Sequence, residues 1–346
     1  MKPIRILHIS DLLLAGDTPS RSGGNQSDLI LKSIVDRFNH ENIDYLVICG
    51  NITKDGSPDA YQLATRQLVA AAQAILGPNH GADLANRIVI VPGECELANG
   101  AESLQKFSEF VNQVRAGLAG NDASQLRQYS QEPVHFLKDF TLIVVPHWPS
   151  EGPGSNISDL ILEAARNSQF EFCRLVPTIL VSSTSPVEKR ATGRTPATRP
   201  GTRVDGRFHI GLHFFGAFRT IVMTPTPFID RHIRIATGPR KRQQSLPLRL
   251  NIVELVAEHS TPGPHERTEK IFFERRFSLR SYALHRHDQH WSEDSWLGGG
   301  PVTLVRHTMA DQDLLDVHRS LRQELLSWIN GAEMEIYRGL SRPVED

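Results

Sequence analysis

The sequence predicts an α/β fold built around a mostly parallel sheet, because its first half alternates buried strands with amphipathic helices. The apolar runs at residues 4–10, 45–49 and 87–93 have the length and composition of buried strands. Residues 29–38 and 58–76 separate these runs and carry apolar side chains at helical spacing. Strands that are joined through helices form right-handed crossovers, which make neighbouring strands parallel.

The composition is that of an ordinary globular protein. The chain has 346 residues, 39% of them hydrophobic and 22% charged, which suffices for one large domain or two smaller ones. A formal net charge of -1 argues against a protein that coats nucleic acid. The three cysteines form no Cys-x-x-Cys pair, which is typical of a reducing compartment, so we predict a cytoplasmic location. No apolar stretch approaches the roughly 18 residues of a membrane span, so we expect no membrane partner.

The second half of the sequence contains shorter strands. Residues 141–148, 178–184 and 208–218 are strand-like runs that end in turn residues, and a helix is expected around residues 156–169. Short apolar runs from about residue 220 to residue 286, separated by Pro, Gly and charge, predict antiparallel pieces of a second sheet.

Two segments differ from this pattern. Residues 185–207 contain three Pro, three Gly and six Lys or Arg but two acids, which predicts an exposed, mobile basic loop. Residues 309–340 carry apolar side chains at helical spacing and predict a C-terminal helical tail. The apolar face of that tail must be buried on the parent domain or on a partner. We therefore predict one domain over residues 1–290, followed by the tail.

Polar residues stand where three predicted strands end. Asp11, Asn51 and Glu94 each follow a strand of the first half. The carboxyl ends of parallel strands meet at one edge of a sheet, where ligands bind. This grouping favours an anion or metal site, and the alternative is that Asp and Asn serve only as turn residues.

The segments around these strand ends resemble, in order and spacing, the motifs of the calcineurin-like metallophosphoesterases. The runs ILHISDLLL, DYLVICGNITKDGSPDAY and IVIVPGECE resemble the family's Asp-x-His, Gly-Asp and Gly-Asn-His segments. TILVSSTSP resembles the family's strand-borne histidine segment, and GLHFFGAFRT resembles its closing Gly-His-x-His. The resemblance covers residues 1–285 and implies a four-layer α/β/β/α sandwich with two sheets face to face.

The resemblance also implies a centre of two divalent ions that hydrolyses phosphate esters. The position of the histidine that protonates the leaving group falls here on Cys95. The metal-ligand positions fall on Asp11, Leu13, Asn51, Glu94, Thr184, Ala217 and Arg219. Only Asp11 is unchanged among them, Leu13 and Ala217 carry no ligand atom, and Arg219 is a fixed cation. We therefore expect a vestigial site without a metal or another cofactor.

This interpretation predicts a non-catalytic domain that acts in protein interaction, regulation or ligand sensing, with another protein as its partner. One alternative is a metal-dependent phosphodiesterase or phosphatase with an atypical site. A second alternative is a nucleic-acid-binding module. For that role, the basic loop offers the anion-binding candidates Arg190, Arg194, Arg199 and Arg203.

The loss of two metal ions has an electrostatic consequence. Asp11 and Glu94 would remain as buried carboxylates without a counter-charge, which is costly. A guanidinium matches a carboxylate in charge and geometry. We therefore expect Arg219 to form an ion pair with Asp11, or else with Glu94.

Two histidine patterns have simpler explanations. His8 lies in an apolar strand, which predicts a residue of the core. The run HRHDQH at residues 285–290 has a metal-like composition. No acid or Cys stands at the spacing of a zinc site, so a solvated strand end is expected.

Overall fold

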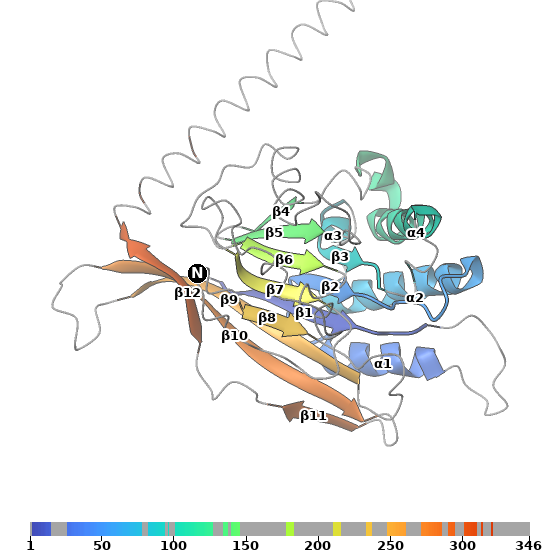
Figure 1. Cartoon of the computed structure of the whole chain (residues 1–346), viewed down its shortest axis with the longest axis horizontal. Coiled ribbons are helices and arrows are strands. Elements are labelled where there is room, and N and C mark those ends of the chain that lie inside the picture. Colours follow the sequence, from blue (N-terminus) through green and yellow to red (C-terminus); the bar gives the residue numbers. More distant parts are fainter. Residues whose placement is uncertain are drawn as a thin grey trace, which may run out of the picture. The chain divides into compact units, whose positions relative to one another are not determined.

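A computed structural model confirms the α/β class, with strands in two sheets accompanied by helices (Figure 1). The chain divides into two compact units, residues 1–257 with 275–305 and residues 258–274 with 306–346. The first unit contains the residues of the candidate site and of the candidate interaction surface. The structure describes residues 2–14, 26–77, 82–93, 96, 101–126, 134–137, 140–145, 178–182, 210–215, 233–236, 248–260, 271–285, 290–294, 301–309, 313 and 320.

The three strands predicted in the first half form one end of a sheet that has seven strands in the described part of the chain, with the third of them at its edge. They are β1 (Ile4–Ser10), β2 (Tyr45–Cys49) and β3 (Ile88–Val91). β1 is parallel to β2, and β2 is parallel to β3, as expected for strands joined through helices. Their carboxyl ends therefore lie at one edge of the sheet.

The same sheet continues on the other side of β1 with strands from the C-terminal part. β9 (Leu248–Ser260) runs antiparallel to β1, followed by β10 (Phe272–His285) and β11 (His290–Asp294). β12 (Val302–Thr308) also pairs with β10. The prediction that this region belongs to a second sheet is wrong for β9 and β10. Residues 250–253 of β9 are buried without alternation, which is typical of an interior strand covered on both faces.

In the part of the chain that the structure describes, the second sheet has five strands. They follow the chain in the order β4 (Val134–Leu137), β5 (Phe140–Val145), β6 (Thr178–Ser182), β7 (Ile210–Phe215) and β8 (Ile233–Ala236). β4 is antiparallel to β5, and the pairs from β5 to β8 are parallel. The prediction that the segment of β8 is antiparallel is therefore wrong. The chain between β7 and β8 is long enough for the crossover that a parallel pair requires.

The described residues contain four α-helices. They are α1 (Gln26–Phe38), α2 (Pro58–Leu76), α3 (Ala82–Asn86) and α4 (Ala101–Ala119), and a 3-10 turn η1 (Gly120–Gln125) follows α4. The helices pack on one another. In addition, α2 contacts β2, and α3 contacts β3. No helix in the described part of the chain is long and apolar enough to cross a membrane.

The start of α2 shows how local sequence sets a helix boundary. The Ser57 hydroxyl accepts a hydrogen bond from the Ala60 backbone N–H at 3.3 Å. Pro58 takes the first helical position, where a missing N–H costs nothing. The helix therefore begins at the residue that the sequence predicts.

His8 lies between the two sheets and confirms its assignment to the core. Its ring is fully buried and lies 4.8 Å from the ring of Phe214 on β7. His8 Nδ1 is 3.5 Å from the side-chain nitrogen of Asn251, whose oxygen accepts a hydrogen bond from the Ser281 hydroxyl at 2.7 Å. Burial lowers the pKa of His8 to about 3, so the imidazole is neutral near pH 7.

The C-terminal end of α1 is held by a cluster of charges that we call the Glu41 cluster, comprising Arg37, Glu41, Arg280 and Tyr282. Arg37 Nη1 donates to the Glu41 carboxylate at 3.2 Å, and Arg280 Nη2 donates to its other oxygen at 3.1 Å. Arg280 also donates to the Tyr282 hydroxyl at 3.1 Å. The guanidinium of Arg37 lies 4.9 Å from the centre of the Tyr282 ring. The cluster therefore ties α1 to β10.

Three predicted segments lie outside the described residues. They are the helix around residues 156–169, the basic loop at 185–207, and the tail at 309–340 apart from Met309, Asp313 and Ser320. Their structures remain predictions.

Candidate functional site

The carboxyl ends of β1, β2 and β3 meet at one corner of the first sheet. Asp11 N–H donates to the Gly50 carbonyl at 3.2 Å, and Gly50 N–H donates to the Val91 carbonyl at 2.9 Å. Beyond the strands, Leu13 N–H donates to the Asn51 carbonyl at 2.9 Å. The loops after β1 and β2 therefore stay hydrogen-bonded to each other.

Gly93 makes the third strand end fit against the second. A Cβ atom at this position would lie 2.1 Å from the Asn51 backbone nitrogen and 2.6 Å from its side-chain oxygen. Both distances are far inside van der Waals contact, so any side chain here displaces backbone. The close approach brings the loop after β3 onto Asn51.

The backbone at this corner is left-handed at three residues other than glycine. The φ angles are 52° at Asp11, 51° at Leu13 and 39° at Asn51. This region costs an L-residue about 1 kcal/mol or more, although Asn and Asp tolerate it better than Leu. Such strain clusters at functional sites, and here it marks the positions that the sequence singled out.

Asp11 and Asn51, predicted from their strand ends to lie close together, are in direct contact. Asn51 Nδ2 donates to Asp11 Oδ1 at 2.6 Å, and the Ser10 hydroxyl donates to Asp11 Oδ2 at 3.1 Å. The two residues are 2% and 3% exposed. A carboxylate this close to an amide must face its NH₂ end. The amide therefore acts as a donor toward Asp11.

Cys49, the last residue of β2, is buried beneath this corner. Burial raises its thiol pKa well above the ordinary value, and the negative charge of Asp11 raises it further. The thiol therefore stays protonated and is a poor nucleophile.

Glu96 is a residue of this corner that the sequence reasoning missed. Its Oε1 accepts from the Thr53 backbone N–H at 2.8 Å and from the Thr53 hydroxyl at 3.1 Å. Its Oε2 accepts from the Gly93 N–H at 2.8 Å. Burial raises the pKa of Glu96, and the hydrogen bonds from Thr53 and Gly93 offset part of that rise. The available signal was the second acid of PGECE, two positions after Glu94.

We refer to the residues of this corner as the strand-end site, comprising Ser10, Asp11, Asn51, Thr53, Gly93 and Glu96. The resemblance places one of the two metal ions on the positions of Asp11, Leu13 and Asn51. These residues do not fit that ion. Asn51 turns N–H groups toward the one retained carboxylate, and N–H groups cannot ligate a metal. Leu13, in the histidine position of the first motif, carries no ligand atom. Among the residues described, no group of three or more His, Cys, Asp or Glu is arranged to hold a metal ion.

The remaining predicted site residues lie outside the described residues. They are Glu94, Cys95, Thr184, Ala217 and Arg219, together with the anion-binding candidates Arg190, Arg194, Arg199 and Arg203. The ion pair of Arg219 with Asp11 or Glu94 therefore stays a prediction. Of the run at 285–290, His285 Nε2 lies 2.9 Å from the Ser292 hydroxyl.

Comparisons with known proteins find one family model and several solved structures that are similar to this chain. Residues 4–170 match the family model of the calcineurin-like phosphoesterases. Among solved structures, the chain is similar to a purple acid phosphatase from yellow lupin (Lupinus luteus) seeds, with 11% identity and a TM-score of 0.43. That match covers 84% of this chain but 53% of the lupin chain. A dimetal phosphatase from Danio rerio matches with 11% identity and a TM-score of 0.42, over 88% of this chain and 99% of the other. No curated protein matches the sequence.

Proposed function

Because residues 4–170 match the family model of the calcineurin-like phosphoesterases, we propose that this chain is a non-catalytic member of that family. In this proposal the domain acts through binding, as an interaction, regulatory or ligand-sensing module with another protein as its partner. The cytoplasmic location that we propose with it rests on cysteine usage.

One observation carries the proposal. The bridging carboxylate of the family motif is replaced by Asn51, whose amide donates to Asp11 at 2.6 Å. A bridging ligand must offer lone pairs to two cations, and this side chain offers hydrogen atoms to an anion instead. The arrangement stabilises Asp11 without a metal, which supports loss of the dinuclear centre.

The first test measures metal content and hydrolysis on the full chain. We expect that after incubation with Mn²⁺, Fe²⁺ or Zn²⁺ and desalting, elemental analysis finds well under one ion per chain. We also expect that bis-nitrophenyl phosphate is hydrolysed no faster than in buffer. A near-stoichiometric metal together with a rate that disappears in Asp11→Ala would overturn the proposal.

The second test restores the bridging carboxylate with Asn51→Asp. The substitution exchanges a charge-assisted hydrogen bond for two carboxylates in contact, so we expect a loss of at least about 2 kcal/mol at pH 7. The loss should shrink toward pH 5, because the pair can then share a proton. Asn42→Asp is the matched control, since Asn42 is exposed and also left-handed with a φ of 50°. Equal effects of the two substitutions would contradict the role given to Asn51.

A further inference from the structure

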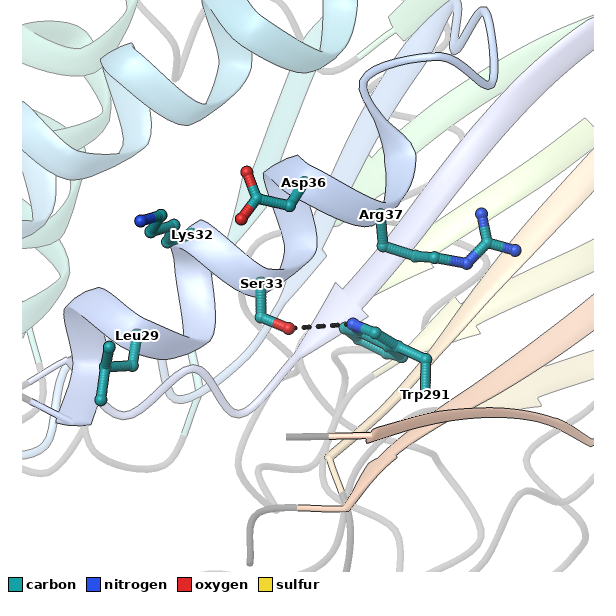
Figure 2. A pocket seen from close by; sticks show the side chains of 6 residues that line it. All are labelled: Leu29, Lys32, Ser33, Asp36, Arg37 and Trp291. Carbon is teal, nitrogen blue, oxygen red and sulfur yellow. Dashed lines mark hydrogen bonds between the residues drawn. The ribbon is translucent and has the colours of Figure 1, made fainter. Parts of the chain in front are cut away.

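A groove lies between α1 and the edge strand β11, and none of its lining residues belongs to the strand-end site. It has a volume of about 400 Å³ and is lined by Leu29, Lys32, Ser33, Asp36, Arg37 and Trp291. Figure 2 shows the five helix residues along α1, with Trp291 reaching across from β11. The other four helix residues follow Leu29 by three, four, seven and eight positions, a spacing that places all five on one face of the helix.

The two walls of the groove are fixed to each other. Trp291 Nε1 donates to the Ser33 hydroxyl at 2.9 Å, and its ring packs edge-on against Phe38 at 5.4 Å. Just after α1, the Glu41 cluster ties the chain to β10 through the hydrogen bond from Arg280 to Glu41. The groove is therefore a preformed feature of the first unit.

Both walls present groups that a partner can use. In the part of the chain that the structure describes, β11 pairs with β10 on one side, and its other backbone edge has no strand against it. An open edge offers a row of N–H and C=O groups to a further strand. Leu29 is 51% exposed, one of two large apolar side chains so exposed in the described residues.

We propose that a second copy of this chain occupies the groove, through antiparallel pairing of β11 with β11 of that copy. A two-fold axis perpendicular to the sheet joins the two first sheets into one continuous sheet. The same axis keeps both α1 helices on one face and sets them antiparallel over the seam. The edge strands and the apolar residue Leu29 are then covered in both copies. This proposal does not depend on whether the strand-end site is catalytic.

The charges on α1 argue for a second copy as the occupant. Lys32 and Asp36 are exposed and stand one helical turn apart on the groove face. An antiparallel copy of the helix reverses their order. Lys32 of each copy then faces Asp36 of the other copy. The face is thus complementary to itself, as an isologous interface requires.

The helices are a necessary part of the contact. A specific dimer buries roughly 1,200–2,000 Å² in total, which five residues of edge strand cannot supply. The exposed face of α1 adds the remaining area and the apolar contact.

The test is the mass of the full chain in solution, measured by light scattering from about 1 to about 100 µM. We expect a concentration-dependent dimer. Leu29→Lys should weaken it by about a hundredfold or more, because symmetry removes two apolar contacts at once. Ile271→Lys is the matched control, since Ile271 is 52% exposed but lies in the second unit, and it should leave the dimer unchanged.

A charge swap tests the geometry. Lys32→Glu or Asp36→Lys alone should weaken the dimer by about tenfold, because each places two like-charged pairs across the axis. The double variant Lys32→Glu/Asp36→Lys should restore it. A chain that stays monomeric throughout this range, or a dimer indifferent to both Leu29→Lys and the single charge reversals, would overturn the proposal.

Discussion

Two glutamates at opposite sides of the first unit are held by opposite means. Glu96 in the strand-end site is 1% exposed and accepts hydrogen bonds from uncharged donors of Thr53 and Gly93. Glu41 has a side chain 20% exposed and lies between the guanidinium groups of Arg37 and Arg280. Both carboxylates connect segments far apart in the sequence. Of the two, only Glu41 is held by cationic side chains.

The consequence is that the two acids titrate in opposite directions. Burial raises the pKa of Glu96 more than its hydrogen bonds lower it. Burial also raises the pKa of Glu41, but the hydrogen bonds and charges of Arg280 and Arg37 together outweigh this, and the net shift is downward. Neutral donors thus satisfy the geometry of a carboxylate without stabilising its charge as cations do.

The largest effect is expected from a substitution at Gly93, whose N–H donates to Glu96. Gly93→Ala keeps the N–H that bonds Glu96 but sets a Cβ 2.1 Å from the Asn51 backbone. We expect a loss of more than about 3 kcal/mol in the free energy of unfolding, measured by urea denaturation. Gly117→Ala is the control, since its Cβ meets only the Val69 side chain, at 2.8 Å, within a helix. A similar small change in both variants would show that the corner is not tightly packed.

The next largest effect belongs to His8, whose titration overlaps that of both glutamates. Its folded pKa of about 3 lies below the ordinary value of 6.5, so the unfolded chain takes up the proton first. Stability therefore falls as the pH drops, by about 3 kcal/mol between pH 7 and pH 4 from this group. Denaturation of His8→Leu across this range should show that part of the slope removed. An unchanged acid slope in the variant would contradict the buried neutral imidazole.

Glu96→Gln removes the charge of the buried acid and keeps the shape of its side chain. The amide has one acceptor oxygen, so either Thr53 or Gly93 loses its partner, and we expect a cost of about 2 kcal/mol. Because the folded pKa of Glu96 is raised, its wild-type contribution is complete below pH 4.5 and declines as the pH rises through the folded pKa. Stability curves of the variant should lack that decline. If the stability of the wild-type protein does not decline in this way as the pH rises, ionisation of Glu96 costs the folded state no free energy, which would contradict the prediction.

The smallest effect is expected at Glu41. Arg280→Met removes one of its two cations and the donor to Tyr282, and the partly exposed pair is worth about 1 kcal/mol. The folded pKa of Glu41 is lowered, so its contribution is present above pH 4.5 and is lost as the pH falls through the folded pKa. NMR titration should find the Glu41 pKa higher in the variant. If the pKa of Glu41 is the same in the variant, Arg37 alone stabilises the charge of the Glu41 carboxylate.

Local sequence predicted the parts of the fold that local physics decides. Ser57 and Pro58 fix the start of α2, and the apolar runs of β1 and β2 end where Asp11 and Gly50 follow. The helix α4 was missed, although Phe107, Phe110 and Val114 stand at helical spacing and are buried.

The parts that were mispredicted or not foreseen depend on pairings between distant segments. The placement of β9 in the first sheet follows from its register with β1, which no local pattern encodes. The same holds for the site. Strand ends located Asp11 and Asn51, but the bond from Thr53 to Glu96 joins two loops and became visible only in the fold. The left-handed backbone at Leu13 has no sequence signal, because leucine rarely adopts it.

The pairing of β1 with β9 also has a consequence for synthesis of the chain. Ile4 lies opposite Leu255, so β1 leaves the ribosome about 250 residues before its partner strand β9. At roughly 5–20 residues per second, this delay lasts about 10 to 50 s. During translation one edge of β1 is therefore without its partner strand, which makes the nascent chain a natural client for chaperones that shield unpaired strands.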